Sequence, residues 1–210
     1  MNPTRLLLAD DHQLLREGLK LLLQQDPALQ VIAETGDGAE VIPLLQQHQP
    51  QLAVLDHSLP GMSGLDIVRE VTRLALPVRC LLLTSYGKAM LVADAIRAGV
   101  SGFVIKDSAF TELRTAVDHA LRGELFLSHA IDRAALRQAL ASTPVSDRER
   151  EVLRLLIQGQ SAKEIAEALG MSPRTAETHR NHLMAKFDAR NAADLVAKAL
   201  ESGYSHRTQL

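Results

Sequence analysis

The chain has 210 residues, of which 46% are apolar and 23% are charged, as in an ordinary globular protein of one or two domains. A formal net charge of −2 excludes a polybasic, sequence-blind nucleic-acid coat, although it allows a local basic face. The single cysteine, Cys80, excludes a disulfide framework and a cysteine-rich zinc site. The apolar stretches are too short for a membrane span and no signal peptide is recognisable, so we expect a cytoplasmic protein that engages no membrane.

Charge is distributed unevenly along the chain. Residues 1–125 carry a net charge of −4, whereas residues 126–143 and 144–210 each carry +1. An acidic first part joined to a slightly basic last part predicts two units with different tasks.

The acidic part contains five short apolar runs at nearly regular intervals. They are Leu6–Ala9, Val31–Ala33, Leu52–Leu55, Leu81–Leu83 and Phe103–Ile105. Uninterrupted apolar runs are typical of parallel strands buried on both faces. The stretches between them have apolar residues at helical spacing, as in the leucine stripe of residues 14, 15, 19, 22 and 23. This alternation predicts an α/β fold, a doubly wound (βα)5 parallel sheet ending near residue 123.

Polar side chains follow four of these predicted strands. Asp10 and Asp11 follow the first strand, Asp56 the third, Thr84 the fourth and Lys106 the fifth. Ligands of open α/β sheets bind at the carboxyl ends of the strands, so we expect these groups to converge. Three carboxylates repel one another unless a cation lies among them, and hard oxygen ligands favour Mg²⁺. An aspartate there can also act as the nucleophile toward a phosphoryl group.

Each of these residues has a simpler interpretation when it is taken singly. An aspartate after a strand often caps the next helix, and a lone lysine is most often a solvated side chain. The combination at four strand ends favours the functional interpretation. We interpret the nearby His12 and His57 as solvated or capping residues, although His57 could tune access to Asp56.

These segments, together with Pro60-Gly61 and Gly102–Lys106, resemble the receiver domain of two-component response regulators. The resemblance implies that Asp56 accepts phosphate from a histidine kinase. It implies a Mg²⁺ site of four residues: Asp10 through water, Asp11, Asp56 and the backbone carbonyl of Ser58. It also implies three residues that respond to the phosphoryl group: Thr84, Phe103 at the aromatic switch position, and Lys106.

The last part of the chain predicts only helices. Residues 125–143 are typical of a linker that contains a helix, and this segment stops at Pro144. Ser146 and Glu149 fit a capping box at the start of the next helix. Two short helices joined at Gly170, the second spanning 173–186, then predict a helix-turn-helix. An amphipathic helical hairpin with no role in DNA binding is the alternative.

Residues 148–196 resemble a LuxR-type helix-turn-helix, and the whole chain resembles a NarL/FixJ-family response regulator. The implied domains are a receiver (1–124), a linker with a helix (125–143) and a small all-α, four-helix DNA-binding domain (144–210). The resemblance implies base contacts from three residues: Glu177, Thr178 and Asn181. It implies phosphate contacts from five residues: Lys163, Arg174, Thr175, Arg180 and Lys186. The final helix, about 191–202, would form dimers or pack within its own domain.

The sequence therefore predicts a non-enzymatic transcriptional regulator, in which phosphorylation of Asp56 controls homodimer formation and promoter binding. Two alternatives stay open. An aspartate-nucleophile phosphohydrolase often carries a second aspartate two residues after the nucleophile, where this chain has Ser58. A constitutive DNA-binding regulator with a merely structural receiver would not depend on phosphate.

Overall fold

The computed structural model describes residues 3–85, 87–202 and 204. The chain divides into two compact units. Among the described residues, the first unit comprises the chain up to Gly87 and from Ala95 to Ile131, and the second comprises Lys88–Asp94 and the chain from Asp132 onward. Each unit has its own fold and is described by itself.

The first unit is built on a parallel sheet with the order β2-β1-β3-β4-β5-β6. Its strands are β1 (Thr4–Ala9), β2 (Leu29–Thr35), β3 (Leu52–Asp56), β4 (Arg79–Thr84), β5 (Gly102–Ile105) and β6 (Phe126–Leu127). All five predicted strands are present, and the doubly wound α/β prediction is confirmed. The central strands are buried along almost their whole length, as their uninterrupted apolar runs indicated.

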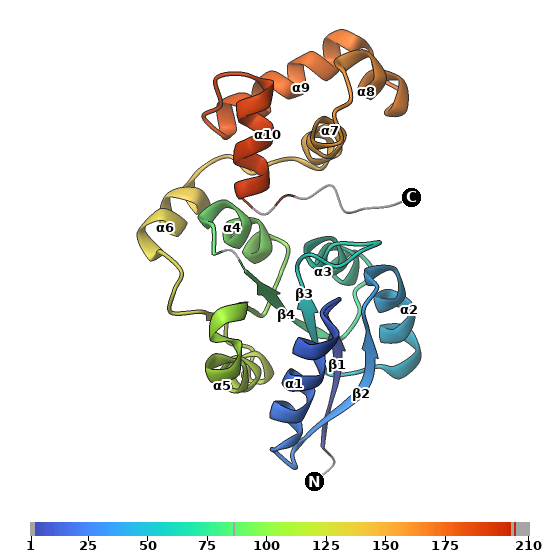
Figure 1. The fold of residues 1–210 in the computed structure, drawn as a ribbon, viewed down its shortest axis with the longest axis vertical. Helices are drawn as coiled ribbons and strands as arrows, with labels where there is room; N and C mark the ends of the chain where they lie inside the picture. Colours follow the sequence, from blue (N-terminus) through green and yellow to red (C-terminus); the bar gives the residue numbers. More distant parts are fainter. Residues whose placement is uncertain (1–2, 86, 203, 205–210) are drawn as a thin grey trace. The chain divides into compact units, whose positions relative to one another are not determined.

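The helices of this unit are α1 (Gln13–Gln24), α2 (Gly38–His48), α3 (Gly64–Arg73) and α5 (Ala109–Arg122), whereas the residues of α4 (Ala89–Arg97) up to Asp94 belong to the second unit. One core cluster joins α1 and α5 to alternate residues of the strands, such as Leu8 and Val54, so these two helices cover one face of the sheet. Helices α2 and α3 pack beside each other away from that face (Figure 1). None of the helices in the described ranges is long and apolar enough to cross a membrane.

Two expectations for this unit were incomplete. Leu14 lies in the predicted apolar stripe of α1 but is 86% exposed, because the face that packs on the sheet is filled by Leu19 and Leu23. The segment after α5 was predicted as a linker, but Phe126 and Leu127 form β6, which pairs with β5 through Gly102. Two residues are too short for a periodic signal, so their strand depends on the neighbouring backbone. The predicted helix of this segment is α6 (Arg133–Ala141).

The C-terminal helices are α7 (Asp147–Ile157), α8 (Ala162–Ala168), α9 (Pro173–Lys186) and α10 (Ala192–Glu201). The predicted capping box of Ser146 and Glu149 is present, and Ser161 and Glu164 form a second one. Gly170 has a φ of +62° in the turn between α8 and α9, a conformation that favours glycine. Helices α8 and α9 therefore form the predicted helix-turn-helix, packed on a core that includes Val152, Ile165, Leu183 and Leu195.

An ion pair inside the helical unit connects the start of α7 to the end of α9. Glu149 is only 4% exposed, and its Oε2 lies 2.5 Å from the Lys186 ammonium. The Ser146 amide donates to the same oxygen at 2.7 Å, and Lys186 also donates to the Pro144 carbonyl at 2.7 Å. Burial raises the pKa of Glu149, but the hydrogen bonds from Lys186 and Ser146 outweigh it and hold the pKa below its ordinary value.

We expect Glu149→Ala to lower the free energy of unfolding of the helical unit by about 3 kcal/mol at pH 7, because it leaves a largely buried ammonium without its carboxylate. Glu151→Ala on the same helix is the control: its pair with Arg148 is 40–45% exposed, so we expect a loss below about 1 kcal/mol. Urea unfolding followed by circular dichroism measures both. Equal losses would contradict the prediction.

The difference in free energy of unfolding between the wild type and Glu149→Ala should depend on pH. The pKa of Glu149 is lower in the folded chain than its value of about 4.3 in the unfolded chain. The ionised carboxylate therefore stabilises the fold fully above the unfolded pKa, and this stabilisation is lost as the pH falls through the folded pKa. The difference between the wild type and Glu149→Ala should therefore shrink below about pH 4.

Candidate functional site

Two buried carboxylates and a partly buried ammonium meet at the carboxyl edge of the sheet. Asp10 directly follows β1, Asp56 ends β3 and Lys106 follows β5, so parallel strands of one sheet, with β4 between β3 and β5, bring them to the same edge. The Lys106 ammonium lies 2.9 Å from Asp10 Oδ2 and 2.8 Å from Asp56 Oδ2. Asp10 is fully buried and Asp56 is 1% exposed. The structure thus brings together the three groups that the sequence placed at separate strand ends.

Asp11 and His12 form the more open side of the same cluster. The Asp11 side chain is 22% exposed, and His12 Nδ1 lies 2.7 Å from Asp11 Oδ1 and 3.3 Å from Asp10 Oδ1. The His12 amide also donates to Asp10 Oδ1 at 2.8 Å. His12 is the N-cap residue of α1 and its side chain is exposed, as the sequence predicted, and its position next to two acids explains its contacts with both carboxylates.

The cluster has the chemistry of a divalent cation site. Ligand atoms of Asp10, Asp11, His12 and Asp56 all lie within 4.8 Å of one another. Three carboxylates face one ammonium, which leaves two negative charges in excess when His12 is neutral. Within the described residues, Asp10 Oδ2 and Asp56 Oδ2 have no hydrogen-bond partner beyond their ion pairs with Lys106. These oxygen donors suit Mg²⁺.

Burial and pairing oppose each other at Asp56. Burial raises the pKa of the Asp56 carboxyl, and the hydrogen bond and charge of Lys106 offset only part of that effect, so the pKa lies above its ordinary value. Burial lowers the pKa of Lys106, but its bonds to Asp10 and Asp56 outweigh burial and hold the pKa above its ordinary value. The ammonium therefore stays charged at neutral pH beside two acids.

The loop after β3 is held close to Asp56. The Ser58 amide donates to Asp56 Oδ1 at 3.2 Å, and the Gly64 amide donates to the His57 carbonyl at 3.0 Å. A Cβ at position 64 would lie 2.3 Å from the Asp56 carbonyl oxygen, so only glycine allows this approach. His57 is 5% exposed, so the expectation of a solvated ring was wrong. The backbone of His57 continues the pairing of β3 with β4, since the His57 amide donates to the Leu83 carbonyl, and this holds the residue in the buried part of the unit.

Thr84 lies on β4, the strand beside β3, and Phe103 lies on β5, the next strand of the sheet. Thr84 ends β4 at the carboxyl edge and is 2% exposed, and Phe103 is fully buried in β5. Their strands are in register, with Thr84 opposite Ile105 and Leu82 opposite Phe103. Their roles after phosphorylation stay predictions.

The predicted DNA-contacting residues divide into two groups. Most are at the surface of α8 or α9: Lys163, Arg174, Thr175, Glu177, Thr178 and Asn181 are exposed, and Arg180 is half-buried. The opposite side of α9 buries Ala176 and Leu183. Lys186 differs, because its ammonium is paired with Glu149. This pair gives Lys186 a structural contact, and the predicted DNA contacts stay predictions.

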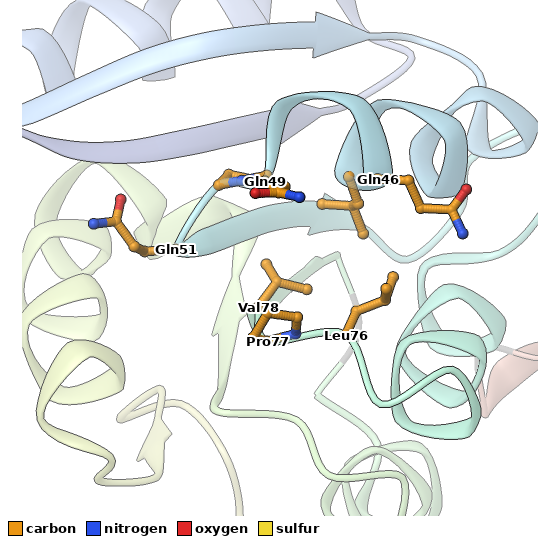
Figure 2. A pocket seen from close by; sticks show the side chains of 8 residues that line it. Gln46, Gln49, Gln51, Leu76, Pro77 and Val78 are labelled. Atoms are coloured by element: carbon orange, nitrogen blue, oxygen red, sulfur yellow. The ribbon is translucent and has the colours of Figure 1, made fainter.

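A separate cavity of about 420 Å³ lies at the opposite edge of the sheet (Figure 2). Its lining comes from the end of α2 and from the loops that precede β3 and β4: Leu45, Gln46, Gln49, Pro50, Gln51, Leu76, Pro77 and Val78. It contains neither a carboxylate nor an ammonium group, so it offers no group for phosphoryl chemistry. The acidic cluster is therefore the candidate site.

We expect Asp56→Asn to raise the free energy of unfolding of the first unit by about 1 kcal/mol in EDTA, because one ammonium then faces one buried carboxylate instead of two. Adding Mg²⁺ should reduce this difference in free energy of unfolding, because the ion stabilises the wild type. Thermal unfolding measures both effects, and Asp118→Asn on the exposed side of α5 is the control. A variant less stable than the wild type in EDTA would refute this account of the cluster.

Comparison with known proteins finds two families, each matching one part of the chain. Residues 6–118 match the response regulator receiver domain, and residues 143–199 match the bacterial regulatory proteins of the luxR family. The probable transcriptional regulatory protein NarL of Mycobacterium tuberculosis is 34% identical over 201 residues, which cover 93% of each chain. The transcriptional regulatory protein UhpA of Escherichia coli is 35% identical over 92% of this chain and 96% of UhpA.

The fold also matches a solved structure over most of its length. RcsB from Salmonella enterica serovar Typhimurium, bound to the promoter rprA in the presence of phosphomimetic BeF3−, matches with a TM-score of 0.70. The match covers 94% of this chain and 98% of that chain at 22% identity, which supports the fold alone. From the family matches and the identity to NarL and UhpA, we conclude that the chain belongs to the two-component response regulators, with a receiver domain followed by a LuxR-type DNA-binding domain.

Proposed function

We propose that Asp56 accepts a phosphoryl group from the phosphohistidine of a sensor histidine kinase. The observation that carries this proposal is the Lys106 ammonium between the buried Asp10 and Asp56 carboxylates. An oxygen of Asp56 attacks phosphorus, the phosphorus–nitrogen bond of the donor breaks, and its electron pair stays on the imidazole nitrogen. Lys106 neutralises charge on the transferred group and holds Asp56 in place. The phosphate stays on the chain, so the protein acts as a switch and not as an enzyme.

The residues that would hold Mg²⁺ are Asp10 through water, Asp11, Asp56 and the Ser58 carbonyl. The bound ion would neutralise phosphoryl oxygens during transfer. The excess of two negative charges in the cluster supports this assignment. The buried side chains keep water away from the deep side of the site, and the more exposed Asp11 leaves an open side for the donor.

Phosphorylation would shift the receiver between two conformations. By analogy with other phosphorylated side chains, it adds about −1.5 to −2 charges and new acceptor oxygens beside Lys106 and Thr84. Thr84 and Phe103 would re-pack in response, and the shift corresponds to a few kcal/mol in a two-state equilibrium. The domains we propose for this switch are the receiver (1–124), the linker (125–143) and the DNA-binding domain (144–210).

The output of the switch would be promoter binding by a homodimer in the cytoplasm. RcsB, which shares the fold, is described as dimers bound to DNA. Helix α9 would enter the major groove, with Glu177, Thr178 and Asn181 at base edges. Five residues would contact phosphates, and they are the predicted set of Lys163, Arg174, Thr175, Arg180 and Lys186.

We expect the purified protein to gain one phosphoryl group when it is incubated with acetyl phosphate and Mg²⁺, as measured by intact mass. Asp56→Ala should gain none, and EDTA should prevent the gain in the wild type, because the reaction needs both the nucleophile and the cation. The outcome against the proposal is labelling of Asp56→Ala to the same extent as the wild type, or no labelling while a known receiver is labelled in parallel.

We expect Arg174→Ala to weaken binding to all DNA sequences and to reduce the slope of log affinity against log salt by about 1, because one phosphate contact is lost. Asn181→Ala should cost about 1–3 kcal/mol only on selected sites and so relax specificity. Fluorescence anisotropy on DNA selected with the phosphorylated protein measures both. Arg154→Ala, an exposed arginine of α7 outside the helix-turn-helix, is the charge-matched control. The assignment fails if all three variants behave alike.

A further inference from the structure

We propose that Arg16 is a positioning residue for the metal site. Its guanidinium holds the peptide between Asp10 and Asp11, and through that peptide it orients the Asp11 carboxylate toward the cation. This inference rests on the proposed function, because it assigns a role to Arg16 in the same acidic cluster.

Arg16 lies within the turn that carries the two aspartates. It is half-buried on α1, one helical turn after His12, and its amide donates to the His12 carbonyl at 2.9 Å. Its Nη1 donates to the carbonyl oxygen of Asp10. On the other side lies Gly36, where a Cβ would be 3.4 Å from Nη1 and 3.7 Å from the Asp10 carbonyl oxygen. The guanidinium therefore fills the space between the β1–α1 turn and the loop after β2.

The other polar groups of Asp10 have other partners. The Asp10 amide donates to the Thr35 carbonyl at 3.1 Å, and the Asp10 carboxylate is used by Lys106 and the His12 amide. The Asp10 carbonyl and the Asp11 Cα lie in the same peptide plane. Rotation of this plane would swing the Asp11 side chain, and the Arg16 hydrogen bond opposes that rotation.

The charge and the geometry of Arg16 act on a cation in opposite directions. A positive charge near the cluster repels a divalent cation, so simple loss of that charge would tighten metal binding. Loss of the hydrogen bond to the Asp10 carbonyl would weaken binding by loosening Asp11. Groups that orient metal ligands typically change metal affinity about 10–100-fold, whereas the charge of a half-exposed arginine is screened by solvent. We therefore expect the geometric effect to dominate.

The test uses Mn²⁺ as the probe, because it prefers the same oxygen ligands as Mg²⁺ and its free form is counted directly by electron paramagnetic resonance. Binding is measured on the full chain for the wild type, Arg16→Met and Lys20→Met. Methionine keeps the apolar stem of the side chain and removes the donors and the charge. Lys20 lies one turn further along α1 and pairs with Glu34, so it is the matched control for loss of a cation.

We expect Arg16→Met to bind Mn²⁺ at least about 10-fold more weakly than the wild type, and Lys20→Met to stay within about twofold. Equal or tighter binding by Arg16→Met overturns the inference. If circular dichroism shows that Arg16→Met is unfolded, Arg16→Leu, which also removes the donors and the charge, decides in the same assay: weaker binding than Lys20→Met supports the inference, and unchanged or tighter binding overturns it.

Asp11→Ala separates the inference from the proposed function. A wild type that binds Mn²⁺, together with an Asp11→Ala variant that does not, supports the metal site whatever Arg16 does. A wild type that does not bind Mn²⁺ contradicts the metal site, and the role of Arg16 fails with it.

Discussion

One ammonium shared by two buried carboxylates is the interaction on which the receiver unit depends. Lys106 lies within 3 Å of oxygens of both Asp10 and Asp56, and it is the nearest compensation for two charges that solvent barely reaches. This ion pairing allows the carboxylates to lie close together in the folded unit, but it leaves the cluster with excess negative charge. In the proposed function, a divalent cation and then a phosphoryl group would bind where this excess negative charge lies.

The backbone around this cluster has little freedom. The β1–α1 turn is held by Thr35, His12 and Arg16, and the loop after β3 is held by the hydrogen bond from the Gly64 amide to the His57 carbonyl. Both segments connect buried strands to helices, so the sheet itself supports the site. In the proposed function, this site on rigid strand ends would respond to phosphorylation by small shifts, because the packed core beneath it does not deform continuously.

The helical unit also contains an ion pair with little exposure to solvent, and this one connects two helices. The Glu149–Lys186 pair is nearly buried and ties the start of α7 to the end of α9, while hydrogen bonds from Ser146 satisfy the carboxylate. This pair fixes the end of α9 relative to the core of the helical unit. It therefore also positions the helix that carries most of the residues proposed to contact DNA. Lys186 therefore has a structural contact that its similarity to a phosphate-binding residue did not indicate.

Periodicity and strand-end chemistry determined much of this protein from the sequence alone. The apolar runs specified a parallel sheet, the polar residues after them specified where Asp10, Asp56 and Lys106 meet, and Ser146 with Glu149 specified the start of α7. Strand β6, the exposure of Leu14, the burial of His57 and the contact of Arg16 with the Asp10 carbonyl were decided by the tertiary structure. Local patterns encode which face of an element is apolar, but a two-residue strand, a crowded helix face and a side chain bound to a distant backbone atom depend on neighbours that only the folded chain supplies.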